Sequence, residues 1–421
     1  MELPKENLDT LEKSIRYSLQ DKTLELEAVV NKDISQAKFI QILQKIKQMK
    51  HHVAPEVTEL ETLDISFADR AITERITINH NTNIRKYCKT GTLTGIPPES
   101  VQIMKKERVM FTDVKDYGVR FNLKRETELP MGSAEVQTLL RNMKTLEKYF
   151  RYKKRYSFTT LDGLFSFDMT VVKSSDTRDV RAPTQKKAKR DIKPFLRKYV
   201  VAPEYVNNKD SWFDGLEDNE IVELIGKKYT ELVPKKDVKA SNVFTNKMKY
   251  EVELEFVGNK MTGKRAPNKE ILAKFIENVG YILQEVQDNY FLLAEGRKDR
   301  FFKAYKSLVG SHKFSGPNNV TLEYHNAVQR SYTDYYNTVN VRKGYSVTDK
   351  ADGERNLLLI DENGDSYMFN RKNVVKATGM KINMPNTIVD GEYIKQDKNG
   401  NPIALFMVFD VYFFNGEDIR N

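Results

Sequence analysis

The first half of the chain changes from helical to strand-like spacing of its apolar residues. Apolar side chains recur every three or four positions across residues 7–20 and 33–50, which predicts an amphipathic helix over each range. From about residue 57 to 172, short runs with every second residue apolar are separated by Gly, Pro, Asn and Asp. This spacing predicts mostly antiparallel strands, because alternate residues of a strand share one face.

The second half of the chain has a polar segment, two helical segments and a final strand-rich region. Residues 174–192 are charged and have few apolar side chains to bury, so we expect a mobile loop, with RNA contact as the alternative. Helical spacing over residues 218–234 and 268–309 predicts helices, and strand-like runs return from residue 341. No internal repeat of the solenoid type is evident.

Two strand-like segments, more than two hundred residues apart, share an acidic alternation. They are Leu24-Glu-Leu-Glu27 and Tyr250-Glu-Val-Glu-Leu-Glu-Phe256. Alternation places the glutamates of each segment on one face and the apolar residues on the other. Each segment alone is most simply an amphipathic strand with a solvated acidic face. Together, the two could bring four or more carboxylates into one cavity, which is tolerable around a hard divalent cation such as Mg²⁺ or Mn²⁺.

The strands between these two segments carry basic residues, often with the same alternation. Each basic strand alone is most simply a solvated sheet face. If the sheet closed into a barrel with these faces inward, the interior would be a charged tunnel able to bind a triphosphate. The candidate triphosphate-binding residues are Arg75, Lys106, Arg108, Arg120, Lys124, Arg151, Lys153 and Arg155.

A lysine motif near the C-terminal end carries different chemistry. In Lys350-Ala-Asp-Gly-Glu-Arg355, a lysine is followed by an acid, a glycine and an arginine. A lysine amine attacks a phosphate only when it is deprotonated, and burial beside other cations is the usual way to lower its pKa. Gly353 permits a tight turn beside a phosphate. An isolated motif of this kind is most often a surface hairpin turn.

Two later strand-like runs carry further acidic residues. Glu392 lies in the β-branched run Thr387-Ile-Val-Asp-Gly-Glu-Tyr-Ile394, and Asp410 follows Phe409 inside a nearly continuous apolar run. A carboxylate in such a run is costly to bury unless it is paired or functional. For Asp410, a position at a partly exposed strand end is an equally good interpretation.

Composition narrows the class of protein. A hydrophobic content of 39% is typical of a folded protein. A length of 421 residues is enough for two or three domains. The net charge of +10 favours a polyanionic partner, with RNA or acidic lipid as candidates. No apolar run reaches the length of a membrane span. The N-terminus lacks a signal-peptide core, and Cys88, the single cysteine, fits a reducing compartment.

The ordered motifs K-x-D-G-x-R, D-G-E and F-D resemble those of the covalent nucleotidyltransferases, which include mRNA guanylyltransferases and polynucleotide ligases. The resemblance implies that Lys350 is the nucleophile that becomes Lys-GMP. It also implies a GTP-binding site in which Arg355 and Glu392 contact the nucleotide sugar, Asp410 lies near the phosphate and metal, and Phe409 lies near the nucleotide. The whole candidate set is Lys350, Asp352, Gly353, Arg355, Glu392, Phe409 and Asp410.

The paired acidic strands resemble those of the triphosphate tunnel metalloenzymes. This resemblance implies that Glu25, Glu27, Glu253 and Glu255 bind the catalytic metal, Mg²⁺ or Mn²⁺; whether Glu251 also faces the metal stays open. A tunnel ahead of a guanylyltransferase is similar to the multifunctional mRNA capping enzymes of large cytoplasmic DNA viruses. The expected fold is α+β: an antiparallel β-barrel tunnel over residues 1–262, then a nucleotidyltransferase domain of antiparallel sheets with flanking helices over residues 263–421.

The same resemblance implies the reactions and the setting. A 5′-triphosphate RNA end would lose its γ-phosphate, and GMP from GTP would then be transferred to it. We expect a methyltransferase domain or subunit and the transcription machinery as partners, and the host cytoplasm or the virion as location. Because later guanylyltransferase motifs are missing, we expect the 421 residues to be the N-terminal part of a longer polypeptide. The alternatives are an ATP-dependent RNA or DNA ligase and an inactive RNA-binding scaffold.

Overall fold

The chain forms two compact units, Met1–Asp288 and Asn289–Asn421. The computed structural model describes residues 1–69, 71–181, 228–260, 267–316, 321–327, 340–342, 344–345 and 350–420. The sequence pattern predicts a domain boundary between residues 262 and 263, whereas the first unit continues to Asp288. It does so because helix α8 (Asn268–Gln287) packs against helix α1 (Lys5–Gln20).

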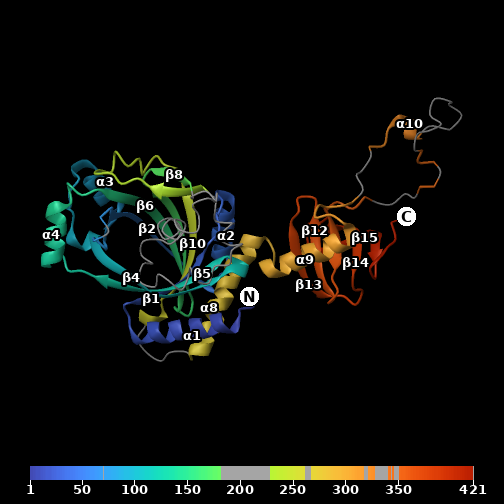
Figure 1. Ribbon diagram of the computed structural model, residues 1–421, viewed down its shortest axis with the longest axis horizontal. Helices are drawn as coiled ribbons and strands as arrows, with labels where there is room; N and C mark the ends of the chain where they lie inside the picture. Colours follow the sequence, from blue (N-terminus) through green and yellow to red (C-terminus); the bar gives the residue numbers. More distant parts are fainter. Residues whose placement is uncertain are drawn as a thin grey trace, which may run out of the picture. The chain divides into compact units, whose positions relative to one another are not determined.

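The first unit is built on a closed antiparallel barrel with the strand order β1-β10-β7-β6-β2-β3-β4-β5 (Figure 1). Its strands are β1 (Leu24–Val30), β2 (Val53–Phe67), β3 (Glu74–Asn79), β4 (Val101–Val114), β5 (Val119–Glu128), β6 (Lys148–Thr160), β7 (Phe165–Ser174) and β10 (Lys249–Phe256). The late strand β10 pairs with β1 on one side and with β7 on the other. The two acidic segments are therefore adjacent strands.

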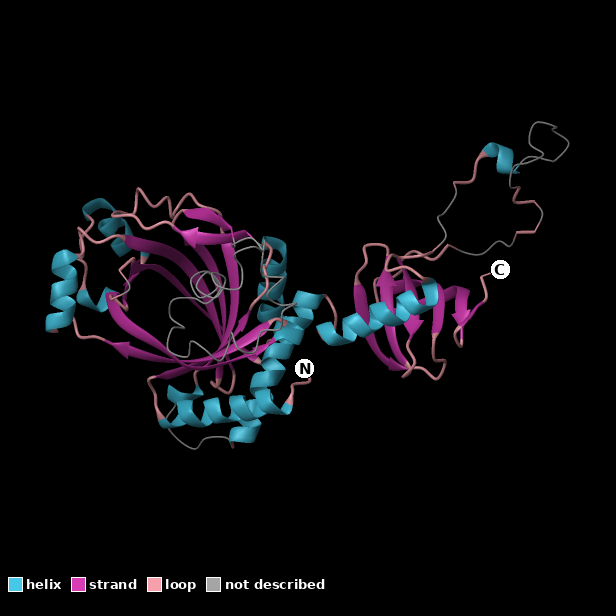
Figure 2. Cartoon of the chain, in the orientation of Figure 1, coloured by secondary structure: helices cyan, strands magenta, loops and turns pink. Residues whose placement is uncertain are grey.

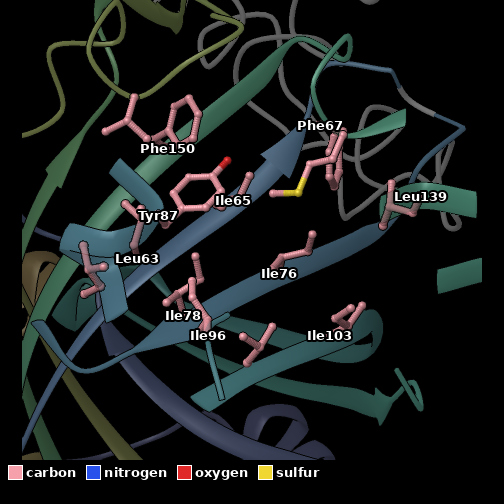
Figure 3. Packing of buried hydrophobic residues seen from close by; sticks show 14 of the residues in the cluster. Leu63, Ile65, Phe67, Ile76, Ile78, Tyr87, Ile96, Ile103, Leu139 and Phe150 are labelled. Atoms are coloured by element: carbon pink, nitrogen blue, oxygen red, sulfur yellow. The ribbon is translucent and has the colours of Figure 1, made fainter. Parts of the chain in front are cut away.

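The barrel has a polar interior and an apolar exterior, the reverse of a domain with a buried central core. On strands β2 and β3 the outward residues Leu63, Ile65, Ile76 and Ile78 are fully buried. They pack under helices α3 (Asn81–Thr90) and α4 (Ala134–Asn142), through side chains such as Tyr87 and Leu139 (Figure 3). Because the apolar face is satisfied outside the barrel, the interior is left for charged side chains.

Helix α8 covers another part of the barrel exterior. The ring of Phe275 lies 5.5 Å from the ring of Phe121 on β5 and 5.5 Å from that of Phe165 on β7. His52, just before β2, is hydrogen-bonded through Nε2 to Asn278 Oδ1 at 2.6 Å. Aromatic pairs of this kind stabilise the fold by more than the burial of their surface area alone. Helix α8 is thus an integral part of the barrel unit.

The local sequence explains where several helices begin and end. Ser35 caps helix α2 (Gln36–Gln48) by accepting a hydrogen bond from Lys38 N–H, and Ser133 caps α4 through Val136 N–H. Gly91 ends α3 with φ 66°, a conformation that favours glycine. The predicted helices over residues 7–20 and 33–50 are confirmed as α1 and α2.

Other local predictions need correction. Helices α3 and α4 interrupt the strand-rich region from residue 57 to 172. A short hairpin, β8 (Thr177–Arg181) with β9 (Lys228–Leu232), occupies the ends of the segments predicted as a loop and a helix. Residues 182–192 of the predicted loop and 218–227 of the predicted helix lie outside the described residues. Within the described residues of this unit, 3₁₀ turns lie at Pro98–Ser100, Lys115–Tyr117 and Gly258–Lys260.

The second unit is an antiparallel sheet with the strand order β13-β12-β11-β14-β15-β16. The strands are β11 (Glu354–Ile360), β12 (Asp365–Asn370), β13 (Val375–Lys381), β14 (Thr387–Gln396), β15 (Pro402–Phe414) and β16 (Glu417–Asp418). Helix α9 (Glu295–Val309) lies on one face of this sheet (Figure 2) and packs on it through Phe301 and Tyr305. A short helix, α10 (Tyr324–Ala327), follows α9 along the chain.

The predicted α+β fold, an antiparallel barrel followed by an antiparallel sheet with flanking helices, is confirmed. The helical prediction over residues 268–309 corresponds to α8 and α9, separated by residues 288–294. Across the residues searched, none of the helices combines the length and the apolar character needed to cross a membrane.

Candidate functional site

A cavity of about 340 Å³ occupies the interior of the barrel. All four glutamates predicted to bind metal line it, together with six of the eight predicted triphosphate-binding residues. The lining residues with charged side chains are Glu25, Glu27, Asp64, Arg75, Lys106, Lys124, Glu126, Glu128, Arg151, Lys153, Arg155, Asp168, Glu251, Glu253 and Glu255. The structure therefore brings the two distant acidic segments into one charged space.

The register of β1 and β10 sets carboxylates directly against one another. Glu27 is opposite Glu255, and Glu253 is opposite Val29, two residues further along β1. Like charges in facing positions destabilise a sheet. The electrostatics agree: burial and then the neighbouring Glu253 raise the pKa of Glu27. Burial, with the further effect of Glu25, raises the pKa of Glu255 to about 7.

Cations offset part of this repulsion. Lys124 Nζ lies 2.5 Å from Glu27 Oε1, and Lys260 Nζ lies 3.1 Å from Glu255 Oε1. Lys260 was not predicted, because it follows the strand and has no alternation to mark it.

Arg155 on β6 forms ion pairs with acidic residues on two other strands. Its guanidinium contacts Asp168 on β7 (2.8 Å) and Glu253 on β10 (3.3 Å). Arg151, also on β6, pairs with Glu251 on β10. The side chain of Glu251 lines the cavity and has a guanidinium partner.

Asp64 on β2 is a charged tunnel residue that sequence reasoning missed. The residue is 5% exposed, Lys153 Nζ lies 2.5 Å from its Oδ2, and Thr77 Oγ1 donates to its Oδ1 at 2.9 Å. Burial opposes ionisation, but Lys153 and then Arg75 hold the pKa of this carboxyl well below its usual range. An aspartate between Leu63 and Ile65 was the available signal.

Lys106 on β4 lies between Glu126, with which it pairs, and Glu25, whose Oε2 is 3.9 Å from its Nζ. Burial, and then the nearby Arg75, lower its pKa to about 8. For Glu25, burial opposes ionisation, but Lys106 and then Lys124 outweigh it and lower the pKa. Lys106 is thus held by carboxylates from β1 and β5.

Two of the predicted triphosphate-binding residues do not line the cavity. Arg108 donates to Asn122 Oδ1 at 3.1 Å, and Arg120 forms two hydrogen bonds with Asp113, at 2.6 and 2.9 Å. Both guanidinium groups lie beside the ring of Phe111. The alternation rule predicts their face correctly, but it does not predict their partners.

The donor chemistry of the cavity fits a hard divalent cation, since its acidic residues offer carboxylate oxygens only. As they stand, no three His, Cys, Asp or Glu side chains in the described part of the chain are grouped closely enough to hold a metal ion. The reason is visible in the contacts above: Glu27, Glu253 and Glu255 each lie against a lysine or an arginine.

In the second unit, Arg355 and Asp390 form a buried ion pair between β11 and β14. Arg355 Nε donates to Asp390 Oδ1 at 3.0 Å, its Nη2 donates to Oδ2, and Tyr412 Oη donates to the same Oδ2. Asp390 is fully buried. It was not predicted, although it lies two residues before Glu392 in the motif. Its role here is to hold the Arg355 guanidinium in position.

The other predicted nucleotide-site residues of this sheet lie around Arg355. Glu392 is its register partner on β14, and Glu392 Oε1 accepts a hydrogen bond from Gly353 N–H at 3.2 Å. The ring centroid of Phe409 lies 5.8 Å from the Arg355 guanidinium, and Asp410 is the register partner of Asp390. The three motifs are thus brought to one region of the sheet.

Lys350 differs from expectation. Its side chain is 86% exposed and lies 3.5 Å from the carboxylate of Asp352, which is 98% exposed. The burial beside other cations that would activate this amine is therefore not present in this conformation. The preceding residues 346–349 lie outside the described residues. Asp410, too, is exposed, and its carboxylate accepts a hydrogen bond from the N–H of Val411 at 2.8 Å.

Comparison with known proteins gives similarity in both units. Residues 295–421 match the family described as mRNA capping enzyme, catalytic domain. The chain is 32% identical over 195 residues to a probable mRNA-capping enzyme of Acanthamoeba polyphaga mimivirus, covering 44% of this chain. It is 33% identical over 87 residues to an mRNA-capping enzyme of Danio rerio, covering 18% of this chain. The matches span 14% of the length of each relative.

Two solved structures resemble the fold at low sequence identity. One is the RNA triphosphatase domain of a trifunctional mimivirus mRNA capping enzyme, with 15% identity, a TM-score of 0.40, and coverage of 67% of this chain and 100% of that chain. The other is an RNA triphosphatase of S. pombe, with 11% identity, a TM-score of 0.35, and coverage of 68% and 95%. The sequence similarity to the mimivirus protein and the family match over residues 295–421 confirm the resemblance to a viral mRNA-capping enzyme.

Proposed function

We propose that this chain carries out two steps of mRNA 5′ capping: removal of the γ-phosphate from a 5′-triphosphate RNA end, and transfer of GMP from GTP to the resulting diphosphate end. The observation that carries the first step is the convergence of β1 and β10 carboxylates with basic side chains in one cavity. The family match over residues 295–421 supports the second step.

For the phosphatase step, we propose that the basic residues of the tunnel bind the triphosphate and that Glu25, Glu27, Glu253 and Glu255 hold Mg²⁺ or Mn²⁺. A bound cation would neutralise phosphate charge and relieve the repulsion between facing carboxylates. Lys106, Lys153 and Arg155 stabilise the negative charge that develops on the phosphate oxygens. A new bond forms between a water oxygen and the γ-phosphorus, and the bond from that phosphorus to the β–γ bridging oxygen breaks.

For the guanylyl step, we propose that Lys350 Nζ attacks the α-phosphorus of GTP. The N–P bond forms, the bond to the pyrophosphate oxygen breaks, and the lysine proton is released. A β-phosphate oxygen of the RNA end then displaces Lys350. Arg355 and Glu392 would orient the nucleotide, with Phe409 beside it. Because Lys350 is exposed in this conformation, GTP binding must bring its amine to the Arg355 region of the sheet.

The substrates of this proposal are 5′-triphosphate RNA and GTP. Similarity to the mimivirus protein supports a viral setting, and we place the reaction in the host cytoplasm or the virion. A methyltransferase and the transcription machinery are the partners we would look for first.

Two variants and two controls test the proposal. Glu253→Gln should lower phosphate release from triphosphate-ended RNA by about 100-fold or more while Lys350-GMP still forms. Lys350→Ala should abolish covalent labelling by GTP and leave phosphate release unchanged. Glu59→Gln, on the barrel exterior beside Lys154, and Lys381→Ala, an exposed lysine paired with Asp365, are the matched controls. A chelator should stop both reactions.

Other outcomes would favour other functions. Covalent labelling by ATP instead of GTP would indicate a ligase, and the absence of both reactions in Mg²⁺ and Mn²⁺ would indicate a scaffold. Loss of both activities in either single variant would contradict two independent sites.

A further inference from the structure

One aromatic side chain, that of Phe111, lies on the interior face of the barrel two strands from the acidic strand β1. Phe111 on β4 is the register partner of Asn122 on β5, and Asn122 in turn pairs with Glu27 on β1. Directly opposed residues of antiparallel strands point to the same face. Phe111 therefore shares the face of Glu27, which lines the tunnel, and Asn122 Nδ2 donates to Glu27 Oε1 at 3.0 Å.

The surroundings of Phe111 are those of a stacking site. The Arg108 guanidinium lies 4.6 Å from the ring centroid and the Arg120 guanidinium lies 5.7 Å from it. Arg120 is held by its two hydrogen bonds to Asp113. Phe111 nevertheless remains 37% exposed, unusual for a phenylalanine on a barrel interior. Rings and guanidinium planes are the surfaces on which proteins stack unpaired bases.

The spacing suits a nucleotide whose phosphates lie at the carboxylates. One row across the sheet runs from Glu255 through Glu27 and Asn122 to Phe111. Neighbouring strands are about 4.8 Å apart, so Phe111 lies about 10 Å from the β1 carboxylates along the wall. A triphosphate held at the acidic and basic walls would thus carry its ribose and base toward Phe111.

We propose that Phe111, with Arg108 and Arg120 at its ring, binds the base of the first nucleotide of the triphosphate-ended RNA. The inference rests on the proposed phosphatase function and adds to it the part of the substrate beyond the phosphates. Stacking recognises the flat face that every base has, so this site selects for a nucleoside without selecting its identity. It distinguishes an RNA end from inorganic triphosphate, which has no base to stack.

The test measures how the 421-residue chain hydrolyses two substrates: a short 5′-triphosphate RNA and inorganic tripolyphosphate. Phe111→Leu keeps apolar bulk and removes the ring, and it should lower kcat/KM for the RNA by about 5- to 100-fold, mostly through KM. Hydrolysis of tripolyphosphate should stay within about twofold of wild type. Phe111→Trp should restore the preference for RNA. Phe244→Leu, a phenylalanine of equal exposure (38%) packed on Tyr152 outside the tunnel, is the control.

The outcomes separate the inference from the function beneath it. If the wild type hydrolyses neither substrate, the proposed phosphatase function has failed. If the wild type is active and Phe111→Leu loses activity equally on both substrates, the ring supports the barrel wall and binds no base. An unchanged ratio of the two activities in Phe111→Leu would equally overturn the stacking site.

Discussion

Asp390 shows how much a single residue contributes to the stability of the second unit. It is fully buried, and it accepts hydrogen bonds from both Arg355 and Tyr412. A buried charge left without its partner is strongly destabilising, whereas an exposed ion pair contributes little. The position of the Arg355 guanidinium therefore depends on a residue that the nucleotide need not touch.

We predict that Asp390→Ala lowers the free energy of unfolding of the second unit by about 3–5 kcal/mol. Hydrogen exchange of the β11 and β14 amides measures this loss within the whole chain. Asp418→Ala removes an aspartate that pairs with Arg420 at the surface and should cost less than about 1 kcal/mol. Equal protection in the two variants would contradict the buried-pair interpretation.

At the residue scale, sequence reasoning found the residues marked by alternation and missed those marked by partnership. Glu25, Glu27, Glu253 and Glu255 repeat every second position, so their shared face could be predicted. Asp64 and Asp390 are single aspartates in apolar runs, and their partners come from other strands. Their importance follows from pairing between strands, which one sequence does not reveal.

Strand β14 depends on two glycines that allow close approach of neighbouring backbones. A Cβ on Gly353 would lie 2.4 Å from the carbonyl oxygen of Tyr393, and one on Gly391 would lie 2.5 Å from that of Met407. Both contacts involve backbone atoms, so no side-chain rotation relieves them. Gly353 lies between Lys350 and β11, and it positions the lysine-bearing segment against β14.

We predict that Gly353→Ala separates this segment from β14 and lowers the rate of Lys350 labelling by GTP on the order of 100-fold, because small displacements of reacting groups are costly. Phosphate release should be unchanged and serves as the internal control. Gly132→Ala, where a Cβ would meet no atom within 4 Å, should leave both activities intact. Normal labelling in Gly353→Ala would show that the close contact is not required.

At the element scale, strands were predicted more reliably than short helices. Helix α3 buries only Ile84 and Tyr87, so its apolar spacing is too sparse to stand out in a strand-rich region. A bulge in β4 between Arg108 and Met110 also changes which residues face inward. Inward positions are even up to Arg108 and odd from Phe111, so simple alternation could not have predicted the aromatic site.

The whole first unit depends on α8, which the sequence pattern assigned to the second domain. Helix α8 buries Ile271, Phe275, Val279, Ile282 and Leu283. Its Phe275 packs on Phe121 and Phe165 of the barrel exterior. The periodicity of a helix shows that one of its faces is apolar, but it does not show which unit that face covers. The predicted domain boundary was therefore placed before α8.

We predict that a fragment of residues 1–288 folds on its own with a cooperative thermal transition, whereas residues 1–262 do not. Without α8 the apolar exterior of β5 and β7 would be exposed to water, and removing even one such large aromatic from a core typically costs about 3–5 kcal/mol. Thermal melts followed by circular dichroism, with dye binding to exposed apolar surface, compare the two fragments. A cooperative melt of the shorter fragment at the same temperature would refute this role for α8.

The strand order of the barrel has a consequence for how the protein is made. Strand β10 is the last of the barrel strands to leave the ribosome, and it fills the gap between β1 and β7. Until then the earlier strands have two open edges, and pairing across so long a stretch of chain is slow. Glu27 and Glu255 meet only across that last seam. The mutual repulsion of the carboxylates is thus postponed to the final step of assembly.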